Sequence, residues 1–193
     1  MPRAFVPHSS EVVIDEDNNF SWPWSKFFEQ LKVRIGAEKQ YALGGKLFSS
    51  VTTTGNVDAG EDDLISYSLE KNTLQNEGDF LEIIAFGTYA NNANNKTLKL
   101  YFDGSVIYTT AIKNPVNTSW QIIARVLRVT STTQKVTVTF SGEALGSAVN
   151  AQYTATTANL AVANIIKCTG TGVATNDIVQ QGLIISIFPA QGE

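Results

Sequence analysis

Apolar and polar residues alternate along much of the chain after residue 40, and this alternation predicts β-strands. It is clearest in residues 97–103, where the side chains expected on the buried side are Leu98, Leu100 and Phe102. A period of two is typical of an antiparallel strand with one face buried. The next pair, Asp103-Gly104, favours a type I′ hairpin turn, because both central residues of that turn need a positive φ.

Ten strands are predicted, near residues 41–52, 63–69, 79–89, 97–103, 105–112, 119–130, 134–141, 149–157, 161–168 and 178–188. Turns rich in Gly and Asn separate them, and no second helical pattern appears among them. We therefore expect an all-β head domain over residues 41–193, built as an antiparallel β-sandwich or jelly roll. Within the 119–130 strand the alternation slips at Val126-Leu127, which predicts a bulge.

The last predicted strand, 178–188, is apolar on both faces, so both faces should be covered. It could lie at the centre of a sheet, or it could present one face to neighbouring subunits around a symmetry axis. We favour the second arrangement, because a large apolar surface left over after core formation marks an interface. This interpretation places Ile185 and Ile187 between subunits.

Two other elements are predicted ahead of the head domain. Residues 1–20 should form an extended arm, because their prolines disfavour helix and an acidic turn follows. Residues 21–36 should form one short amphipathic helix, whose apolar side chains have heptad spacing: Trp24, Phe28, Leu31 and Ile35. A helix of about 15 residues is marginal alone. It should therefore either lie on the sheet core or form a short stalk that holds three copies together.

Composition excludes several classes of protein. The 193 residues carry a net charge of -4, which disfavours a nucleic-acid partner because phosphate binding needs clustered Lys and Arg. No apolar run approaches the ~20 residues that a membrane-spanning helix needs. The first residues lack the apolar core of a secretory signal, so we expect synthesis in the cytoplasm. The single cysteine, Cys168, cannot form a disulfide within the chain.

Residues suited to catalysis are scarce. The only histidine, His8, falls in the predicted arm, where nothing would fix its geometry, and Cys168 falls in a strand as a small buried side chain. One Cys and one His cannot supply a zinc site. Glu82 could point into a cleft, but nothing selects the second carboxylate that a glycosidase needs. We therefore expect no enzymatic activity and no cofactor.

Two loops remain as candidate binding sites. The carboxylates of residues 58–63 could chelate Ca²⁺, or they could simply form a solvated acidic turn. The Asn-rich loop could bind the hydroxyls of a glycan through its side-chain amides, which are those of Asn91, Asn92, Asn94 and Asn95. The same asparagines could instead serve only the turn, because Asn tolerates left-handed backbone.

The pattern of turns and strands resembles a known family. It lies in Thr54-Gly55-Asn56, Glu61 to Leu69, Asn72-Thr73-Leu74, Gly78-Asp79, Ala85 to Thr88, Asn94 to Thr97 and Ser119 to Ile122. These residues resemble a C-terminal β domain of tailed-bacteriophage and prophage virion proteins. Residues 20–28, Phe-Ser-Trp-Pro-Trp-Ser-Lys-Phe-Phe, are similar to a short aromatic helix that often precedes such domains, although Phe27-Phe28 stand where a tryptophan is frequent.

The resemblance implies a homotrimeric jelly-roll-like head in a fibre, spike, tail or capsid decoration, and hence localisation in the virion. Three copies joined through the helix and last strand would leave their arms free to bind capsid, portal or tail proteins by strand addition. The apolar residues available for this anchoring are Phe5, Val6, Val12, Val13 and Ile14. The alternative is a receptor-binding module that recognises a bacterial surface glycan through its distal loops.

Overall fold

The computed structural model describes residue 24 and residues 44–110, 118–142 and 150–190. The chain divides into two compact units, Met1–Leu43 and Gly44–Glu193. In the first unit Trp24 is the described residue, and its backbone is helical. The rest of the predicted arm and helix lies outside the described residues, including Phe5, Val6, Val12, Val13, Ile14, Phe28, Leu31 and Ile35.

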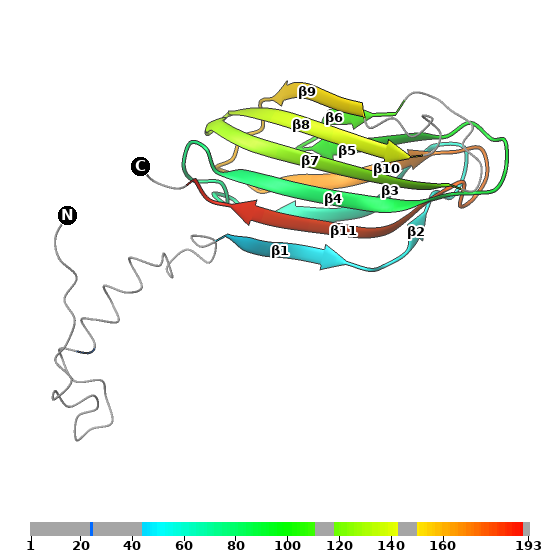
Figure 1. The fold of residues 1–193 in the computed structure, drawn as a ribbon, viewed down its shortest axis with the longest axis horizontal. Helices are drawn as coiled ribbons and strands as arrows, with labels where there is room; N and C mark the ends of the chain where they lie inside the picture. The colour runs from blue at the N-terminus through cyan, green and yellow to red at the C-terminus, as the bar shows by residue number, and fades with distance from the viewer. Residues whose placement is uncertain (1–23, 25–43, 111–117, 143–149, 191–193) are drawn as a thin grey trace, which may run out of the picture. The chain divides into compact units, whose positions relative to one another are not determined.

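The second unit contains two antiparallel sheets. The large sheet has the strand order β1 (Gly45–Ser50), β11 (Ile178–Phe188), β4 (Phe80–Tyr89), β7 (Ser119–Thr130), β8 (Thr133–Gly142) and β9 (Asn150–Thr156), and the short β2 (Thr54–Gly55) also pairs with β11. The small sheet has the order β3 (Glu61–Leu69), β10 (Asn164–Thr171), β5 (Thr97–Phe102) and β6 (Ser105–Thr109). Figure 1 shows the two sheets stacked as layers, with the large sheet towards the viewer. The predicted all-β sandwich is confirmed.

The hydrophobic core lies between the two sheets. It is built from every second residue of the strands, as the alternation predicted. The large sheet contributes, among others, Leu81, Ile83, Ala85, Ile122, Ala124, Val126, Val136 and Val138, and the small sheet contributes Leu98, Leu100, Phe102, Ile166 and Cys168. Each fully buried Leu, Ile, Val or Phe side chain stabilises the fold by about 1.5–3 kcal/mol.

The structure confirms one local prediction and corrects another. Asp103 and Gly104 have φ values of 47° and 74° and connect β5 to β6, as the type I′ turn requires. The irregularity predicted at Val126-Leu127 lies further along, because the β7–β8 register shifts between Arg128 and Thr130. Val126 keeps its inward position, and Leu127 points outward with 36% of its surface exposed.

The interpretation of the last strand was wrong for two residues. β11 lies inside the large sheet, between β1 and β4. Ile185 and Ile187 point into the core of their own chain and are 0% and 1% exposed. They pack within the sandwich and leave no surface for a neighbouring subunit, because the small sheet already covers that face of β11.

Candidate functional site

The outer face of the small sheet is ionic. The Glu61 carboxylate accepts hydrogen bonds from the ammonium of Lys99, the hydroxyl of Tyr101 at 2.6 Å and the hydroxyl of Thr169 at 2.7 Å. Burial opposes ionisation of Glu61, but these donors outweigh it and lower its pKa to about 2. A second ion pair joins Lys167 to Asp63. These side chains bind one another, which leaves this face a well-paired polar surface.

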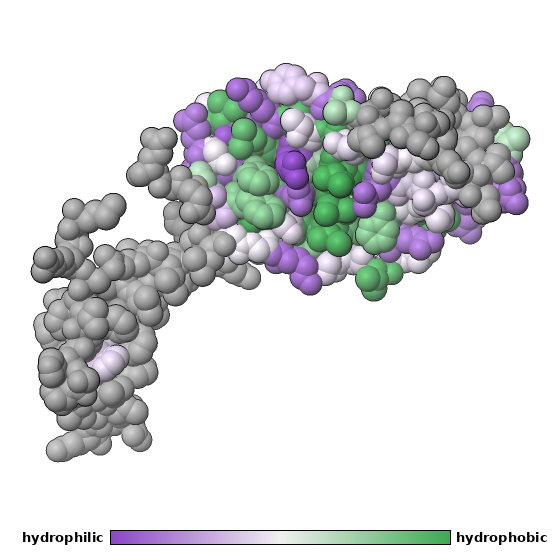
Figure 2. All heavy atoms as spheres, in the orientation of Figure 1, coloured by the Kyte–Doolittle hydropathy of each residue, from purple (hydrophilic) through white to green (hydrophobic). Residues whose placement is uncertain are grey.

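The outer face of the large sheet differs because its register brings like residues into rows across neighbouring strands. One row is apolar and consists of Ile184, Ile84 and Ile123. The next row holds the Glu82–Arg125 ion pair, with 2.8 Å between the charged atoms. Figure 2 shows the result, in which hydrophobic atoms gather over the middle and one end of this face with hydrophilic atoms between them.

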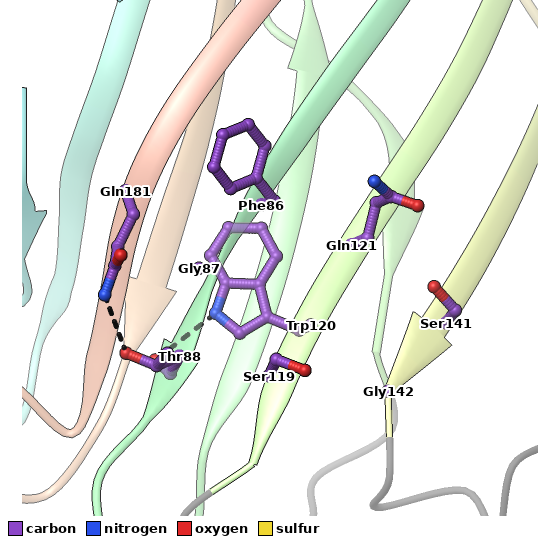
Figure 3. A pocket seen from close by; sticks show the side chains of 9 residues that line it. All are labelled: Phe86, Gly87, Thr88, Ser119, Trp120, Gln121, Ser141, Gly142 and Gln181. Atoms are coloured by element: carbon purple, nitrogen blue, oxygen red, sulfur yellow. Dashed lines mark hydrogen bonds between the residues drawn. The ribbon is translucent and has the colours of Figure 1, made fainter. Parts of the chain in front are cut away.

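A hollow of about 660 Å³ lies on this face, beyond the isoleucine row. Its lining residues come from four strands of the large sheet and are all uncharged: Phe86, Gly87, Thr88, Ser119, Trp120, Gln121, Ser141, Gly142 and Gln181. Figure 3 shows the ring of Phe86 beside Gln181 and Gln121, with Trp120 beneath Gly87. The open side of the hollow thus combines one aromatic ring with several amides and hydroxyls.

A bulge in β11 fixes the ring of Phe86. The register between β11 and β4 shifts between Gln180 and Gly182, and Gly182 then faces Phe86. A Cβ atom at Gly182 would lie 2.4 Å from the tip of the Phe86 ring. Since no side chain fits there, glycine is what allows the ring to lie across the neighbouring strand. The half-buried ring therefore packs against Gly182 and leaves part of its surface open to solvent.

Beneath the hollow, Trp120 provides a rigid floor. Its side chain is 2% exposed, and its indole N–H donates to the backbone oxygen of Thr88 at 3.3 Å. A Cβ atom at Gly87 would lie 2.6 Å from the indole, so this glycine makes room for it. The buried ring thus packs closely against the backbone of β4 at this end of the sheet.

Three polar side chains at the hollow are free to bind a ligand. In the described part of the chain, the side chains of Ser119, Gln121 and Ser141 make no hydrogen bond, whereas Gln181 donates to the hydroxyl of Thr88 at 3.4 Å. Free hydroxyls and an amide next to a fixed aromatic ring suit a ligand that has both an apolar face and several hydroxyl groups. A sugar ring has this chemistry.

In the Asn-rich loop, Asn92 and Asn94 have the structural role that was one of the two alternatives predicted from the sequence. The amide groups of Asn92 and Asn94 donate to the carboxylate of Asp177 at 2.6 and 3.0 Å. The Lys96 ammonium, 2% exposed, donates to the side-chain oxygen of Asn92 at 2.8 Å and to the backbone oxygen of Asn94 at 3.1 Å. Asn92 and Asn94 therefore hold the loop together. Asn91 and Asn95 are exposed and lie free of this network.

Asp177 anchors this loop and is fully buried. Burial by itself would raise its pKa. The hydrogen bonds from Asn92, from the backbone N–H groups of Val173 and Ala174, and from Asn94 outweigh burial and lower the pKa to about 2. The carboxylate is therefore ionised at neutral pH, close to the buried Lys96. Burial lowers the pKa of Lys96, while the charge of Asp177 opposes that change.

The acidic loop of residues 58–63 does not converge on one point. The carboxylate of Asp62 accepts from the backbone N–H of Val57 at 2.7 Å, and that of Asp58 accepts from Gly60 at 2.7 Å. Glu61 and Asp63 point to the ionic face of the small sheet. Among the described residues, no three His, Cys, Asp or Glu side chains are grouped as a metal site.

The other singled-out residues have structural positions. Glu82 lies on the outer face of the large sheet in its pair with Arg125. Cys168 is fully buried in β10, and burial raises the pKa of its thiol to about 12. In the part of the chain that the structure describes, no helix is long and apolar enough to span a membrane.

Sequence reasoning missed the hollow, although a signal for it was present. Phe86 occupies an outward position in a strand whose inward residues alternate regularly. Gly182 interrupts an otherwise apolar strand, which is the usual mark of a bulge or a close approach. The pairing of β11 with β4 was not predictable, so the two signals could not be joined.

The described fold and site thus define an antiparallel β-sandwich with an uncharged hollow, partly aromatic, on one outer face. No family model matches the chain, and no curated protein matches it. Among solved structures, it is similar to the CBM2 module of an evolved Dit protein of Lactobacillus casei BL23 phage J-1. The identity is 8% and the TM-score 0.39, and the similarity covers 78% of this chain and 99% of that one.

It is also similar to peanut lectin with a bound nine-residue peptide. The identity is 8% and the TM-score 0.38, over 77% of this chain and 99% of the lectin. TM-scores of this size are too low to support an inference about what this chain binds.

Proposed function

We propose that this chain is a non-enzymatic saccharide-binding module of a tailed-phage virion, and that the Phe86 hollow is its binding site. The observation that carries the proposal is the fixed ring of Phe86 beside the unpartnered side chains of Ser119, Gln121 and Ser141. A receptor-binding role was the alternative in the sequence interpretation. The sequence interpretation placed the binding site in the Asn-rich loop. We place it instead on the outer face of the large sheet, because Asn92 and Asn94 already bind Asp177.

The chemistry of the lining favours a neutral sugar. The apolar face of a pyranose stacks on Phe86, while its hydroxyls exchange hydrogen bonds with Gln121 and the serines. Each hydrogen bond contributes about 0.5–1.5 kcal/mol net, and one ring supplies a single stacking surface. A single site of this kind binds weakly. Several copies on one particle then raise the overall avidity by linking the binding events.

The virion role rests on the sequence resemblance. In this proposal the N-terminal arm anchors the chain to a capsid, portal or tail protein, and residues 21–36 hold three copies together. Deletion of residues 1–20 is expected to leave a folded oligomer that no longer attaches to particles. Particle-bound protein after that deletion would refute the arm as the anchor.

Binding is tested with the full chain on an array of bacterial surface glycans, followed by titration of any ligand that is found. We expect Phe86→Ala to weaken binding at least tenfold. Ile165→Ala is the matched control, because Ile165 is 44% exposed on the outer face of the small sheet. Absence of glycan binding, or equal binding by the two variants, would exclude the hollow as the site.

A further inference from the structure

A second exposed feature lies at the other end of the same sheet face. We call it the apolar end, and its residues are Phe80, Leu127, Tyr153 and Phe188. The rings of Phe80 and Phe188 stack with 4.8 Å between their centroids and 11° between their planes. The exposed fractions of Leu127, Phe188 and Tyr153 are 36%, 41% and 65%. Exposed apolar side chains that gather in one place mark a candidate interaction surface.

The apolar end surrounds a small hollow of its own. The hollow measures about 280 Å³ and is lined by Phe80, Leu127 and Tyr153, together with Arg125, Lys135 and Thr137. Its exposed lining is almost entirely apolar. Unlike the Phe86 hollow, it offers apolar side chains in its middle and charged ones at its edge, which is the usual arrangement of a protein–protein contact.

The two hollows are separate sites. Phe86 and Phe80 are six residues apart on β4, which is ~20 Å along a strand. The isoleucine row and the Glu82–Arg125 pair lie between them. A ligand at one hollow therefore leaves the other uncovered.

The route of the chain points to a second copy as the partner. Gly45 pairs with Ile187, the neighbour of Phe188, so β1 begins next to the apolar end. The residues before Gly44 are therefore joined to the sandwich next to the apolar end. They contain the heptad pattern of residues 21–36, for which association of copies is one of the two alternatives predicted from the sequence. Association of copies through that segment would tether their sandwiches and so raise the local concentration of apolar ends.

We propose that the apolar end is the contact surface between copies of this chain. Burial of Phe188, Leu127 and Tyr153 against the neighbouring copy removes apolar surface from water, and aromatic residues at the centre of a contact supply most of its binding energy. The sequence interpretation assigned the subunit contact to Ile185 and Ile187. Those residues lie on the inward face of β11, whereas Phe188 of the apolar end lies on the outward face of the same strand. The inference is independent of saccharide binding.

The test measures self-association of the full chain by sedimentation equilibrium over a range of concentrations. The variant Leu127→Asp/Phe188→Asp is compared with Val106→Asp/Ile165→Asp. Val106 and Ile165 are 46% and 44% exposed on the small sheet, so the control pair carries the same new charge at similar exposure. We expect the first pair to weaken association at least tenfold and the control pair to leave it unchanged.

Tyr153→Asp distinguishes loss of the contact from misfolding. Its side chain is 65% exposed, so it can be replaced without disturbing the core. It should weaken association in the same direction, with an unchanged circular dichroism spectrum. A wild-type chain that stays a single-chain species, or an apolar-end variant that associates as strongly as the control, would overturn the inference.

Discussion

The side-chain oxygen of Gln180, in the large sheet, accepts a hydrogen bond from the backbone N–H of Ile65, in the small sheet, at 3.0 Å. Both residues lie at irregularities. The β3–β10 register shifts opposite Leu64 and Ile65, and the β11–β4 register shifts after Gln180. A bulge leaves a backbone group without a strand partner. The side chain of Gln180, at the bulge of the large sheet, therefore supplies a hydrogen-bond acceptor to the backbone N–H of Ile65, at the bulge of the small sheet.

Gln180→Leu should destabilise the sandwich by about 2 kcal/mol, because it leaves the buried N–H of Ile65 without a partner. The same change removes the hydrogen bond from the Gln180 amide to the backbone oxygen of Gly182. Urea unfolding followed by tryptophan fluorescence measures the loss. Gln181→Leu, on the exposed side of the same bulge, is the control and should unfold at nearly the wild-type urea concentration.

Acid should weaken the loop that Asp177 anchors. Its pKa is lowered from 3.8 to about 2 in the fold, so its stabilising contribution is complete above pH 3.8 and is lost as the pH falls through about 2. This shift corresponds to about 2 kcal/mol. Asp177→Asn should lower stability at pH 7 and lose less on acidification from pH 5 to pH 2 than the wild type does. Equal pH profiles of the two unfolding free energies would contradict the assignment.

Gly182→Ala tests how the Phe86 ring is held. The new methyl group would meet the ring, so the ring must turn away or the bulge must shift, at a cost of about 1–3 kcal/mol. We expect lower thermal stability together with weaker glycan binding. Gly104→Ala, in the β5–β6 turn, strains the backbone at φ 74° without touching the hollow, so it should affect stability alone.

Cys168 should be inert in the folded protein. It is completely buried, and burial raises the pKa of its thiol to about 12, so almost no reactive thiolate forms at pH 8. A thiol reagent should modify it only when the sandwich opens. The labelling rate in increasing urea therefore measures opening of β10, and rapid labelling in native buffer would show that this part of the core is looser than described.

The strands were predictable because their signal is local. The alternation of Leu98, Leu100 and Phe102 depends only on neighbours in sequence, and so does the Asp103-Gly104 turn. The short β2 was missed because two residues carry no periodicity.

Side-chain roles that depend on pairing were not predictable. Ile185 and Ile184 are chemically alike, yet one is fully buried and the other half-buried, since the pleat assigns them to opposite faces. The same limit applied to Asn92 and Asn94. Their partner, Asp177, lies more than 80 residues away in sequence, and no local pattern connects them.

The outer faces of the two sheets differ in how much free energy it costs to remove their water. The charged side chains of Glu61, Lys99 and Lys167 make the outer face of the small sheet costly to dehydrate, whereas the uncharged hollow around Phe86 gives up its hydration more readily. In the proposed saccharide-binding role, this difference would favour attachment through the large sheet, so the attachment would be directional before any individual sugar is recognised.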